Sequence, residues 1–368
     1  MSKVLVCTRM PHDNSYVGGV VSIILSYKRH EDIFLDRGYE LEVYSYEPSR
    51  RISSLPSKVS NILYALFQKK EILKKLKNDK VDIVHIHTSR EFLFLKDVFL
   101  TKAISKKTGI PVALTIHVGD IGTVYNRINK ARRMTIQYLN KYAKAVFFLS
   151  REIKDQFVNQ GVNNKISHVL YNFYDFDTEI DNINACENNG ITELLFVGAI
   201  HREKGILELL NSLIGLSGNY HLSICGVITD KSIEETFWQL VSQLGTKVDV
   251  LGYVTGEAKV EAFRRTDIFI LPSYHEGMPL VILEALGSGC AIISTKVGTT
   301  KEILDDDNAL WVDVGSSESL RMAIQRLVNN SSELQKMKKA NYALSKQFCV
   351  DEHIENLCSE YDLLITNS

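Results

Sequence analysis

The stretch DIFILPSYHEGMPLVILEALGSGCAIISTKV, residues 267–297, contains the pattern that decides the fold. Its two short apolar runs, IFIL and AIIST, are bounded by turn residues and predict two buried strands. Between them, Pro279 suits the first turn of a helix, the apolar run that follows favours burial, and Gly287 or Gly289 can end the helix. A strand, a helix and a second strand in this order are typical of a parallel sheet covered by helices.

The same alternation of strand and helix patterns runs along the rest of the chain and restarts once. The restart follows DFDTEIDNINACENNG, residues 175–190, an acidic and Asn-rich segment that indicates a connection between domains. We therefore expect an α/β fold of two doubly wound, Rossmann-like domains, at 1–178 and 190–345, facing a central cleft. Strands are predicted at 3–8, 39–46, 81–87, 110–117, 144–150, 191–200, 221–227, 247–254, 267–273 and 291–297, and helices at 19–34, 59–79, 91–107 and 127–143.

The composition is that of a soluble globular protein. Of the 368 residues, 45% are hydrophobic and 24% are charged, and no apolar run approaches the length of a membrane-spanning helix. The first ten residues lack the long apolar core of a signal peptide. Six scattered cysteines without a C-x-x-C pair fit a reducing cytoplasm, and the three in strand-like runs, Cys7, Cys225 and Cys290, are expected to be small buried thiols.

The net charge of −1 conceals a difference between the two halves of the chain. Residues 1–150 contain 25 Lys and Arg against 13 Asp and Glu, whereas the remainder contains 18 against 31. A basic half indicates an anionic partner. A second explanation, that the opposite charges help the two halves to dock, stays equally open at this stage.

Residues 50–80, in the basic half, combine apolar and basic side chains. A basic amphipathic helix can lie on an anionic membrane surface. The other interpretation is that the apolar side packs on the sheet while the lysines are solvated, and the two are not exclusive. The segment contains nine Lys or Arg against two acids, and its apolar residues include Ile62, Leu63, Leu66, Phe67, Ile72 and Leu73.

Glu276 and Glu284 lie on either side of the helix start predicted at Pro279. Free backbone N–H groups and the helix dipole attract anions, so two acids at this place indicate a ligand lying over the helix N-terminus. Two other interpretations of this stretch stay open: Glu284 as a solvated helix residue and Glu276 as a capping acid.

Three loops after predicted strands carry polar groups at the sheet edge where doubly wound domains bind ligands. Gly18 and Gly19 let the backbone approach a phosphate, but no G-x-G-x-x-G pattern is present, so a nicotinamide or flavin dinucleotide is disfavoured. Arg202 and Lys204 would suit a diphosphate, whose growing charge they could stabilise. His117 ends another strand, where we expect a working group rather than a structural histidine.

Metal binding is considered at three places and not expected at any of them. His85 and His87 point to one face of a strand, but no third ligand is near them in the sequence, so a packed pair is preferred. Residues 175–177, Asp-Phe-Asp, lie in the connection between domains and are discounted. Residues 305–307, three Asp in a predicted turn, are interpreted as solvated.

Eight segments taken in order resemble the retaining glycosyltransferases of family 4, which have the GT-B fold. They are GGV, DIVHIH, PVALTIHVGD, AVFFLS, VLYNFYD, FVGAIHREKG, VLGYV and HEGMPLVILEALGSGCAIIST, and they span nearly the whole chain. The last segment is the most specific, because it contains the family's two glutamates separated by seven residues.

The resemblance implies an NDP-sugar donor on the C-terminal domain and an acceptor largely on the N-terminal domain, without a cofactor or metal. Glu284 would accept hydrogen bonds from the ribose hydroxyls, and Glu276 would contact the donor sugar. Lys204 matches the lysine that binds the diphosphate, and His117 matches the active-site histidine. A terminal helix, residues 350–368, would return to the N-terminal domain.

The remaining donor-binding positions also come from the resemblance. Val254 matches the base pocket, and the backbone from Gly277 to Val281 would approach the sugar and the diphosphate. The family's usual arginine after the strand glycine is Ala199 here, and whether Arg202 replaces it stays open. The implied donor-binding set is Gly18, Gly19, Arg202, Lys204, Val254, Gly277, Met278, Pro279, Leu280, Val281 and Glu284.

The implied function is transfer of a hexosyl-type sugar, with retention, from an NDP-sugar to a hydroxyl acceptor during assembly of a bacterial capsule, O-antigen or exopolysaccharide. Acceptors linked to polyprenyl diphosphate would place the protein on the inner face of the cell membrane. Two alternatives are another GT-B sugar-nucleotide enzyme, such as an epimerase or a phosphorylase, and a non-catalytic binding or scaffold protein. Nucleic acid is not expected as a partner, because aromatic residues are not interleaved with the cations.

Overall fold

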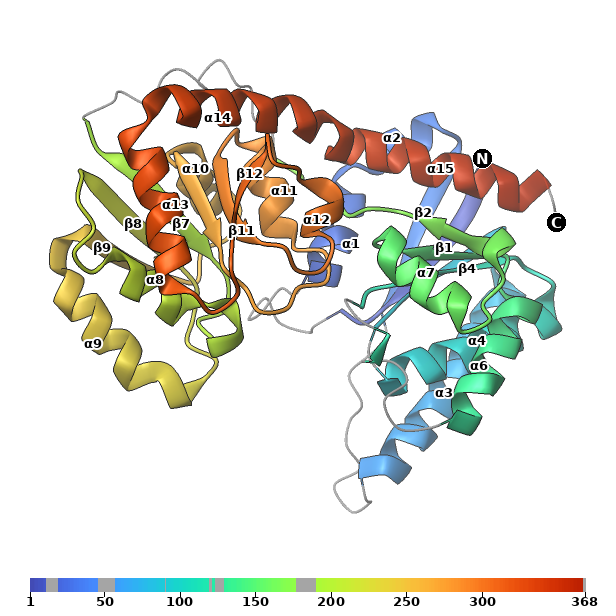
Figure 1. Ribbon diagram of the computed structural model, residues 1–368. Helices are drawn as coiled ribbons and strands as arrows, with labels where there is room; N and C mark the ends of the chain where they lie inside the picture. The colour runs from blue at the N-terminus through green and yellow to red at the C-terminus, as the bar shows by residue number, and fades with distance from the viewer. Residues whose placement is uncertain are drawn as a thin grey trace. The chain divides into compact units, whose positions relative to one another are not determined.

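The computed structural model describes residues 1–10, 19–45, 57–89, 91–118, 121–122, 129–176 and 190–366. The chain divides into two compact units (Figure 1). Unit 1 comprises Met1–Asn172 together with Val350–Ser368, and unit 2 comprises Phe173–Cys349. Most of the segment predicted to connect the domains, residues 177–189, lies outside the described residues, as does Gly18.

Unit 1 contains a parallel six-stranded sheet in the order β2-β1-β3-β4-β5-β6. The chain moves outward in one direction from β1 to β2 and in the other from β3 to β6, so the order reverses between β1 and β3. Ligands bind beside such a reversal in doubly wound sheets. The strands are β1 (Ser2–Thr8), β2 (Tyr39–Ser45), β3 (Ile83–Thr88), β4 (Val112–Ile116), β5 (Ala145–Phe148) and β6 (Ser167–Val169).

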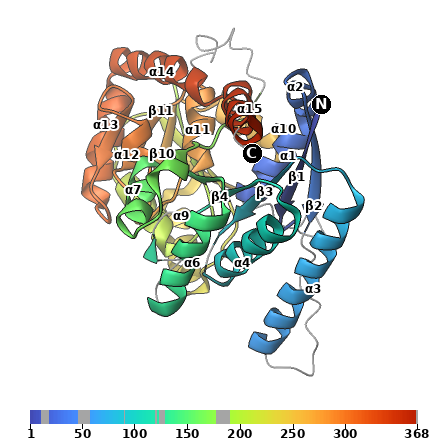
Figure 2. The same ribbon diagram turned by 90° about the vertical axis from the view of Figure 1, so that its right-hand side faces the viewer.

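Helices cover both faces of this sheet, so its central strands are buried on both sides. Val84 and Ile86 of β3 belong to the core under α3, α4 and α6, whereas the alternate residues His85 and His87 contact α15 and α1. Figure 2 shows the positions of these helices around the sheet. The helices are α1 (Gly19–Arg29), α2 (Glu31–Asp36), α3 (Ser57–Asn78), α4 (Glu91–Thr108), α6 (Asn129–Tyr142), α7 (Arg151–Asn159) and α15 (Val350–Thr366), with the 3₁₀ turn η1 (Asn164–Ile166).

The terminal helix α15 packs on unit 1 through buried and charged contacts. Tyr361 is fully buried and its hydroxyl lies 2.7 Å from Nδ1 of His85. Tyr39 donates a hydrogen bond to Asp362 across 2.6 Å. Arg37 and Glu355 form an exposed ion pair at 2.5 Å, which contributes little to stability compared with the buried contacts.

Unit 2 contains a second parallel six-stranded sheet, in the order β12-β11-β10-β7-β8-β9. The direction of winding reverses between β7 and β10, so the loops after these two strands flank the expected ligand position. The strands are β7 (Thr192–Val197), β8 (Tyr220–Cys225), β9 (Val248–Gly252), β10 (Ile268–Leu271), β11 (Ala291–Thr295) and β12 (Ala309–Val312).

The helices of unit 2 enclose its sheet, and their apolar sides form a core of buried Leu, Ile and Phe side chains. Gly289, with φ of +64°, follows the end of α11 in the left-handed conformation that ends many helices. The helices are α8 (Ile206–Leu213), α9 (Glu234–Leu244), α10 (Gly256–Arg264), α11 (Leu280–Gly287), α12 (Thr300–Ile303), α13 (Ser317–Asn329) and α14 (Ser331–Ser345), and the 3₁₀ turns are η2 (Arg202–Lys204), η3 (Lys231–Ile233), η4 (Gly245–Lys247) and η5 (Lys346–Phe348).

The two parallel sheets predicted from the sequence are confirmed, with two corrections to the helices. The helix expected at 19–34 is two helices, because the chain turns at His30. Pro279 is the N-cap of α11 rather than a first-turn residue. The short strands β6 and β12 were not predicted. Burial of the thiols is confirmed for the three cysteines predicted to be buried, Cys7, Cys225 and Cys290.

Candidate active site

Lys204 is placed by two loops of unit 2 that pack directly on each other. It ends η2 in the loop after β7, and Gly205 follows with φ of +68°. A Cβ atom added to Gly205 would collide with the carbonyl oxygen of Pro272, in the loop after β10. The N–H of Tyr274 also donates to the carbonyl of Glu203 across 2.8 Å. Glycine at position 205 therefore allows the loop that carries Lys204 to lie against the loop that carries Glu276.

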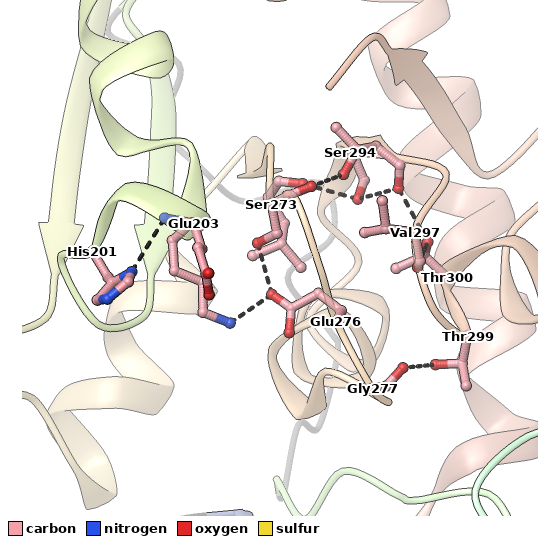
Figure 3. A network of polar contacts seen from close by, with 12 residues as sticks. His201, Glu203, Ser273, Glu276, Gly277, Ser294, Val297, Thr299 and Thr300 are labelled. Carbon is pink, nitrogen blue, oxygen red and sulfur yellow. Dashed lines mark hydrogen bonds and ion pairs between the residues drawn. The ribbon is translucent and has the colours of Figure 1, made fainter. Parts of the chain in front are cut away.

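Glu276 accepts two hydrogen bonds on a single oxygen. Nζ of Lys204 and Oγ of Ser273 each lie 2.7 Å from Oε1, and Figure 3 shows Ser273 beside the carboxylate. The Glu276 side chain is only 9% exposed, whereas that of Lys204 is 30% exposed. Both of these hydrogen bonds from described residues are on Oε1, so Oε2 can accept a hydrogen bond from a ligand.

The loop after β11 holds the backbone next to Glu276. The N–H and the hydroxyl of Thr299 both donate to the carbonyl of Gly277, across 3.0 and 2.9 Å (Figure 3). Gly298 has φ of +56°, and a Cβ atom there would collide with the carbonyl oxygen of Glu276. Buried hydroxyls continue this network, because Thr295 donates to the carbonyl of Ser273 across 2.6 Å. The turn before α11 is therefore held on two sides.

The N-terminus of α11 is open to an anion. Its N-cap, Pro279, makes no side-chain capping hydrogen bond, and the N–H groups of Leu280 and Val281 have no partner in the part of the chain that the structure describes. Met278 and Pro279 are buried, whereas Leu280 and Val281 are half-buried. Unpaired N–H groups at the end of a helix carry partial positive charge, which favours a negative ligand.

Glu284 lies one turn further along α11 and is buried. Its Oε1 receives a hydrogen bond from Nζ of Lys259 across 2.5 Å, while its Oε2 is buried without a hydrogen-bond partner. A buried carboxylate oxygen without a donor costs about 1–3 kcal/mol, so a ligand hydroxyl that reached it would remove this cost. Sequence reasoning missed Lys259, because nothing local marks a residue of α10 that pairs 25 positions away.

Other predicted positions take no part in the described contacts of this site. Val254 is half-buried in the turn between β9 and α10, the helix that supplies Lys259. Arg202 is exposed, and it takes no part in the hydrogen bonds of Glu276. In unit 1, Gly19 begins α1 and is exposed.

His117 follows β4 in unit 1 and is half-buried. Its Nε2 lies 2.9 Å from Nδ1 of His87 on the neighbouring strand β3. Desolvation by the surrounding protein lowers the pKa of His117 from 6.5 to about 3, and repulsion from His353 adds to the shift. His117 is therefore neutral at physiological pH, able to donate or accept a hydrogen bond but not to act as a cation.

His85 and His87 form the packed pair that the sequence predicted, with ring centroids 4.4 Å apart. Both ring nitrogens of His85 lie 2.7 Å from hydroxyl groups, those of Tyr361 and Thr115. Burial lowers the pKa of His85 to about 3. The described residues contain no cluster of three or more His, Cys, Asp or Glu arranged to hold a metal ion. The three Asp at 305–307 are exposed in a turn, as predicted.

Two family models match the chain one after the other. The model described as Glycosyltransferase Family 4 matches residues 18–178, and the model described as Glycosyl transferases group 1 matches residues 179–344. The chain belongs to the family 4 glycosyltransferases. The resemblance on which the sequence-based prediction rested is thereby confirmed.

This glycosyltransferase has relatives in archaea and bacteria. An uncharacterised glycosyltransferase of Methanocaldococcus jannaschii is 25% identical over 367 residues, which cover 95% of each chain. A putative teichuronic acid biosynthesis glycosyltransferase of Bacillus subtilis is 25% identical over 263 residues, 69% of this chain and 64% of the relative. HepE of Anabaena, solved in complex with UDP and glucose, aligns with a TM-score of 0.69 at 16% identity, covering 98% of this chain and 100% of HepE. The fold of this glycosyltransferase is GT-B, as predicted.

Proposed function

We propose that this glycosyltransferase moves a hexosyl-type sugar from an NDP-sugar to a hydroxyl of a saccharide acceptor, with retention and without a metal, in the assembly of a bacterial surface polysaccharide. One observation carries the proposal. Half-buried Glu276 and buried Glu284 flank the open N-terminus of α11. Each has one oxygen held by a lysine, and Oε2 of Glu284 is buried without a hydrogen-bond partner among the described residues. The names of the Bacillus subtilis relative and of the HepE complex support the polysaccharide and the nucleotide in this proposal.

The proposed donor pose assigns a partner to each of these groups. Ribose hydroxyls donate to Glu284, the diphosphate lies over the N–H groups at the start of α11, and a sugar hydroxyl donates to Glu276. Lys204 then exchanges its carboxylate partner for the diphosphate. Each of these contacts replaces water or an internal partner by a charge-assisted hydrogen bond, which is the stronger kind.

The proposed chemistry needs positive charge at the leaving group. Breaking the bond between the sugar and the phosphate produces an oxocarbenium-like sugar and a more negative diphosphate. Lys204 and the N-terminus of α11 supply fixed positive charge where that negative charge grows. We expect transfer to persist in the presence of EDTA for this reason.

Replacing Glu284 by alanine should weaken binding of the preferred nucleoside diphosphate. The lost ribose hydrogen bonds predict a change of about 1–3 kcal/mol in binding free energy. Isothermal titration calorimetry with UDP, GDP and ADP measures it. Glu318→Ala, which removes a 72%-exposed carboxylate from α13, is the matched control and should bind like the wild type.

Equal affinity in folded Glu284→Ala and wild-type protein would contradict the assignment of Glu284 to the ribose. The same titration separates the alternative enzymes, because a phosphorylase would bind inorganic phosphate and no nucleoside diphosphate. A transferase should release NDP only when an acceptor or water is present as the second substrate. This assay separates it from an epimerase and from a non-catalytic binding protein.

We also propose that the protein acts at the inner face of the cell membrane, on an acceptor linked to polyprenyl diphosphate. The two halves of α3 differ: Ile72 and Leu73 are buried in the core of unit 1, whereas the first half extends beyond α4 in Figures 1 and 2. That half exposes Ile62, Leu63, Leu66 and Phe67 by 44% to 59%. The exposed apolar residues of the first half therefore support membrane binding by the 50–80 segment. The buried residues of the second half support the other interpretation, in which the apolar side packs on unit 1. No described helix has the length and apolarity that crossing a bilayer requires.

Binding to anionic liposomes should be measurable at low salt and absent with neutral lipid. Exposed Lys70, Lys74 and Lys77 follow the apolar surface of α3, and each cation near anionic headgroups contributes about 1 kcal/mol. Co-sedimentation is the measurement, with Phe67→Glu as the variant expected to lose binding. Met322→Glu, at a 60%-exposed position of α13, is the control and should retain it. Failure of the wild type to sediment with anionic vesicles at low ionic strength would contradict the membrane proposal.

A further inference from the structure

His87 and His117 are joined by a hydrogen bond between ring nitrogens. Nδ1 of His87 lies 2.9 Å from Nε2 of His117, and the ring planes differ by 20°. His87 lies on β3, paired with Thr115 of the neighbouring parallel strand β4, and His117 directly follows β4. Between two neutral imidazoles one nitrogen donates and the other accepts, so the contact allows two arrangements of protons.

The second ring nitrogen of His87 decides between these arrangements. Nε2 of His87 is buried and has no hydrogen-bond partner. If that nitrogen carried the proton, a buried N–H would be left unsatisfied, whereas in the other arrangement only a lone pair is unfilled. Orphaned buried N–H groups are rarer in proteins than acceptors without a donor. The proton of His87 therefore belongs on Nδ1, which donates to His117.

We propose that His87 is a positioning residue that fixes the tautomer of His117, so that His117 offers an N–H at Nδ1 to a substrate oxygen. Nε2 of His117 accepts from His87 and carries no proton, which leaves the proton of the neutral ring on Nδ1. His117 is half-buried, and its hydrogen bond to a described residue is made by Nε2 rather than Nδ1. The free donor of this ring is therefore the atom available to a ligand.

The ring of His87 packs against two other rings. The centroid of the His85 ring lies 4.4 Å away and that of Tyr27 lies 6.0 Å away. His85 is itself held between the hydroxyls of Tyr361 and Thr115, each at 2.7 Å. Because α15 supplies Tyr361, the terminal helix takes part in orienting the pair.

The proposal adds a defined role for His117 to the proposed function, on which its kinetic consequence rests. A neutral ring with its proton on Nδ1 donates to a hydroxyl or phosphate oxygen, and Nδ1 cannot serve as a proton acceptor. His117 would then bind and orient a donor or acceptor oxygen rather than act as a general base.

The tautomer can be read by ¹⁵N NMR of the full-length protein labelled at histidine. The expected spectrum at pH 7 shows Nε2 of His117 with the shift of an unprotonated nitrogen and Nδ1 with that of a protonated one. His87→Asn keeps an N–H donor near the position that Nδ1 of His87 occupies, so this variant should preserve the pattern. His87→Leu removes the donor and should shift His117 toward the Nε2–H tautomer. A protonated Nε2 in the wild type would overturn the proposal whether or not the protein transfers sugar.

Kinetics separate positioning from a structural effect. We expect His87→Leu to lower kcat about 10-fold or more with little change in KM, because a histidine in the wrong tautomer loses most of its function. His87→Asn should restore most of the rate. In a His117→Ala background, His87→Leu should have no further effect, because the two act as a unit. Equal losses in His87→Leu and His87→Asn, or additive losses with His117→Ala, would overturn the role. If the wild type shows the expected tautomer but His117→Ala is fully active, the result would instead count against a role of His117 in the proposed function.

Discussion

Replacing Lys204 by alanine should lower kcat for sugar transfer by about 10²–10³-fold, the usual effect of removing one charge-stabilising group from an active site. Lys204 is the described cation that contacts Glu276, and its side chain is 30% exposed, so it can reach a ligand. In the proposed reaction it meets the leaving diphosphate, whose charge rises as the sugar departs. The loss should therefore appear in kcat as well as in the affinity for the diphosphate.

The measurement is steady-state release of NDP by wild-type and variant protein, together with titrations of the nucleoside and the nucleoside diphosphate. Lys231→Ala is the matched control, because Lys231 is an exposed cation in η3 of the same unit. Lys204→Ala should weaken binding of the diphosphate more than that of the nucleoside. Equal losses for both ligands, or an unchanged kcat, would show that Lys204 only holds Glu276.

Lowering the pH from 8 to 5 should selectively destabilise unit 1. Burial lowers the pKa of His85 to about 3 and that of His353 to about 4, from 6.5. The folded state therefore binds fewer protons than the unfolded state. The contribution of these two histidines to the unfolding free energy is fully present above pH 6.5 and is lost as the pH falls toward 4 for His353 and 3 for His85. At pH 5 each of these two histidines costs about 2 kcal/mol of unfolding free energy.

The two tryptophans, Trp238 and Trp311, allow this effect to be localised, because both belong to unit 2. Urea unfolding followed by circular dichroism reports on both units, whereas tryptophan fluorescence reports on unit 2. We expect an acid-sensitive transition that dichroism detects and fluorescence does not. His353→Gln removes one titrating group and should reduce the loss between pH 8 and 5 by about 2 kcal/mol. The same pH dependence in wild type and variant would contradict the assignment.

The strands and helices that local spacing determines were predictable from the sequence. Each central strand is a short apolar run between turn residues, and the one between Asp267 and Pro272 is an example. The edge strands β6 and β12 were not predicted, because they contain only three and four residues and are partly buried. They therefore lack a complete apolar run. The break between α1 and α2 at His30 was not predicted for another reason: the apolar pattern continues across it into α2.

Contacts between distant residues were not predictable from spacing. The pairs Lys259–Glu284 and His87–His117 join residues 25 and 30 positions apart, and the alignment of neighbouring strands or helices creates both. Glu276, before α11, and Glu284, within it, were found because their spacing is typical of the family. The lysine partners and the tautomer of His117 depend on packing, which a single sequence does not display.

The central claim is that unit 2 holds an NDP-sugar with its ribose on Glu284 and its diphosphate on Lys204. A crystal structure of the protein with its preferred nucleoside diphosphate tests this most directly. The account predicts a ribose hydroxyl within hydrogen-bonding distance of Glu284, the diphosphate at the N-terminus of α11, and Nζ of Lys204 moved from Glu276 to a phosphate oxygen. A nucleotide bound elsewhere, with Lys204 still on Glu276 and no ribose contact to Glu284, would contradict it.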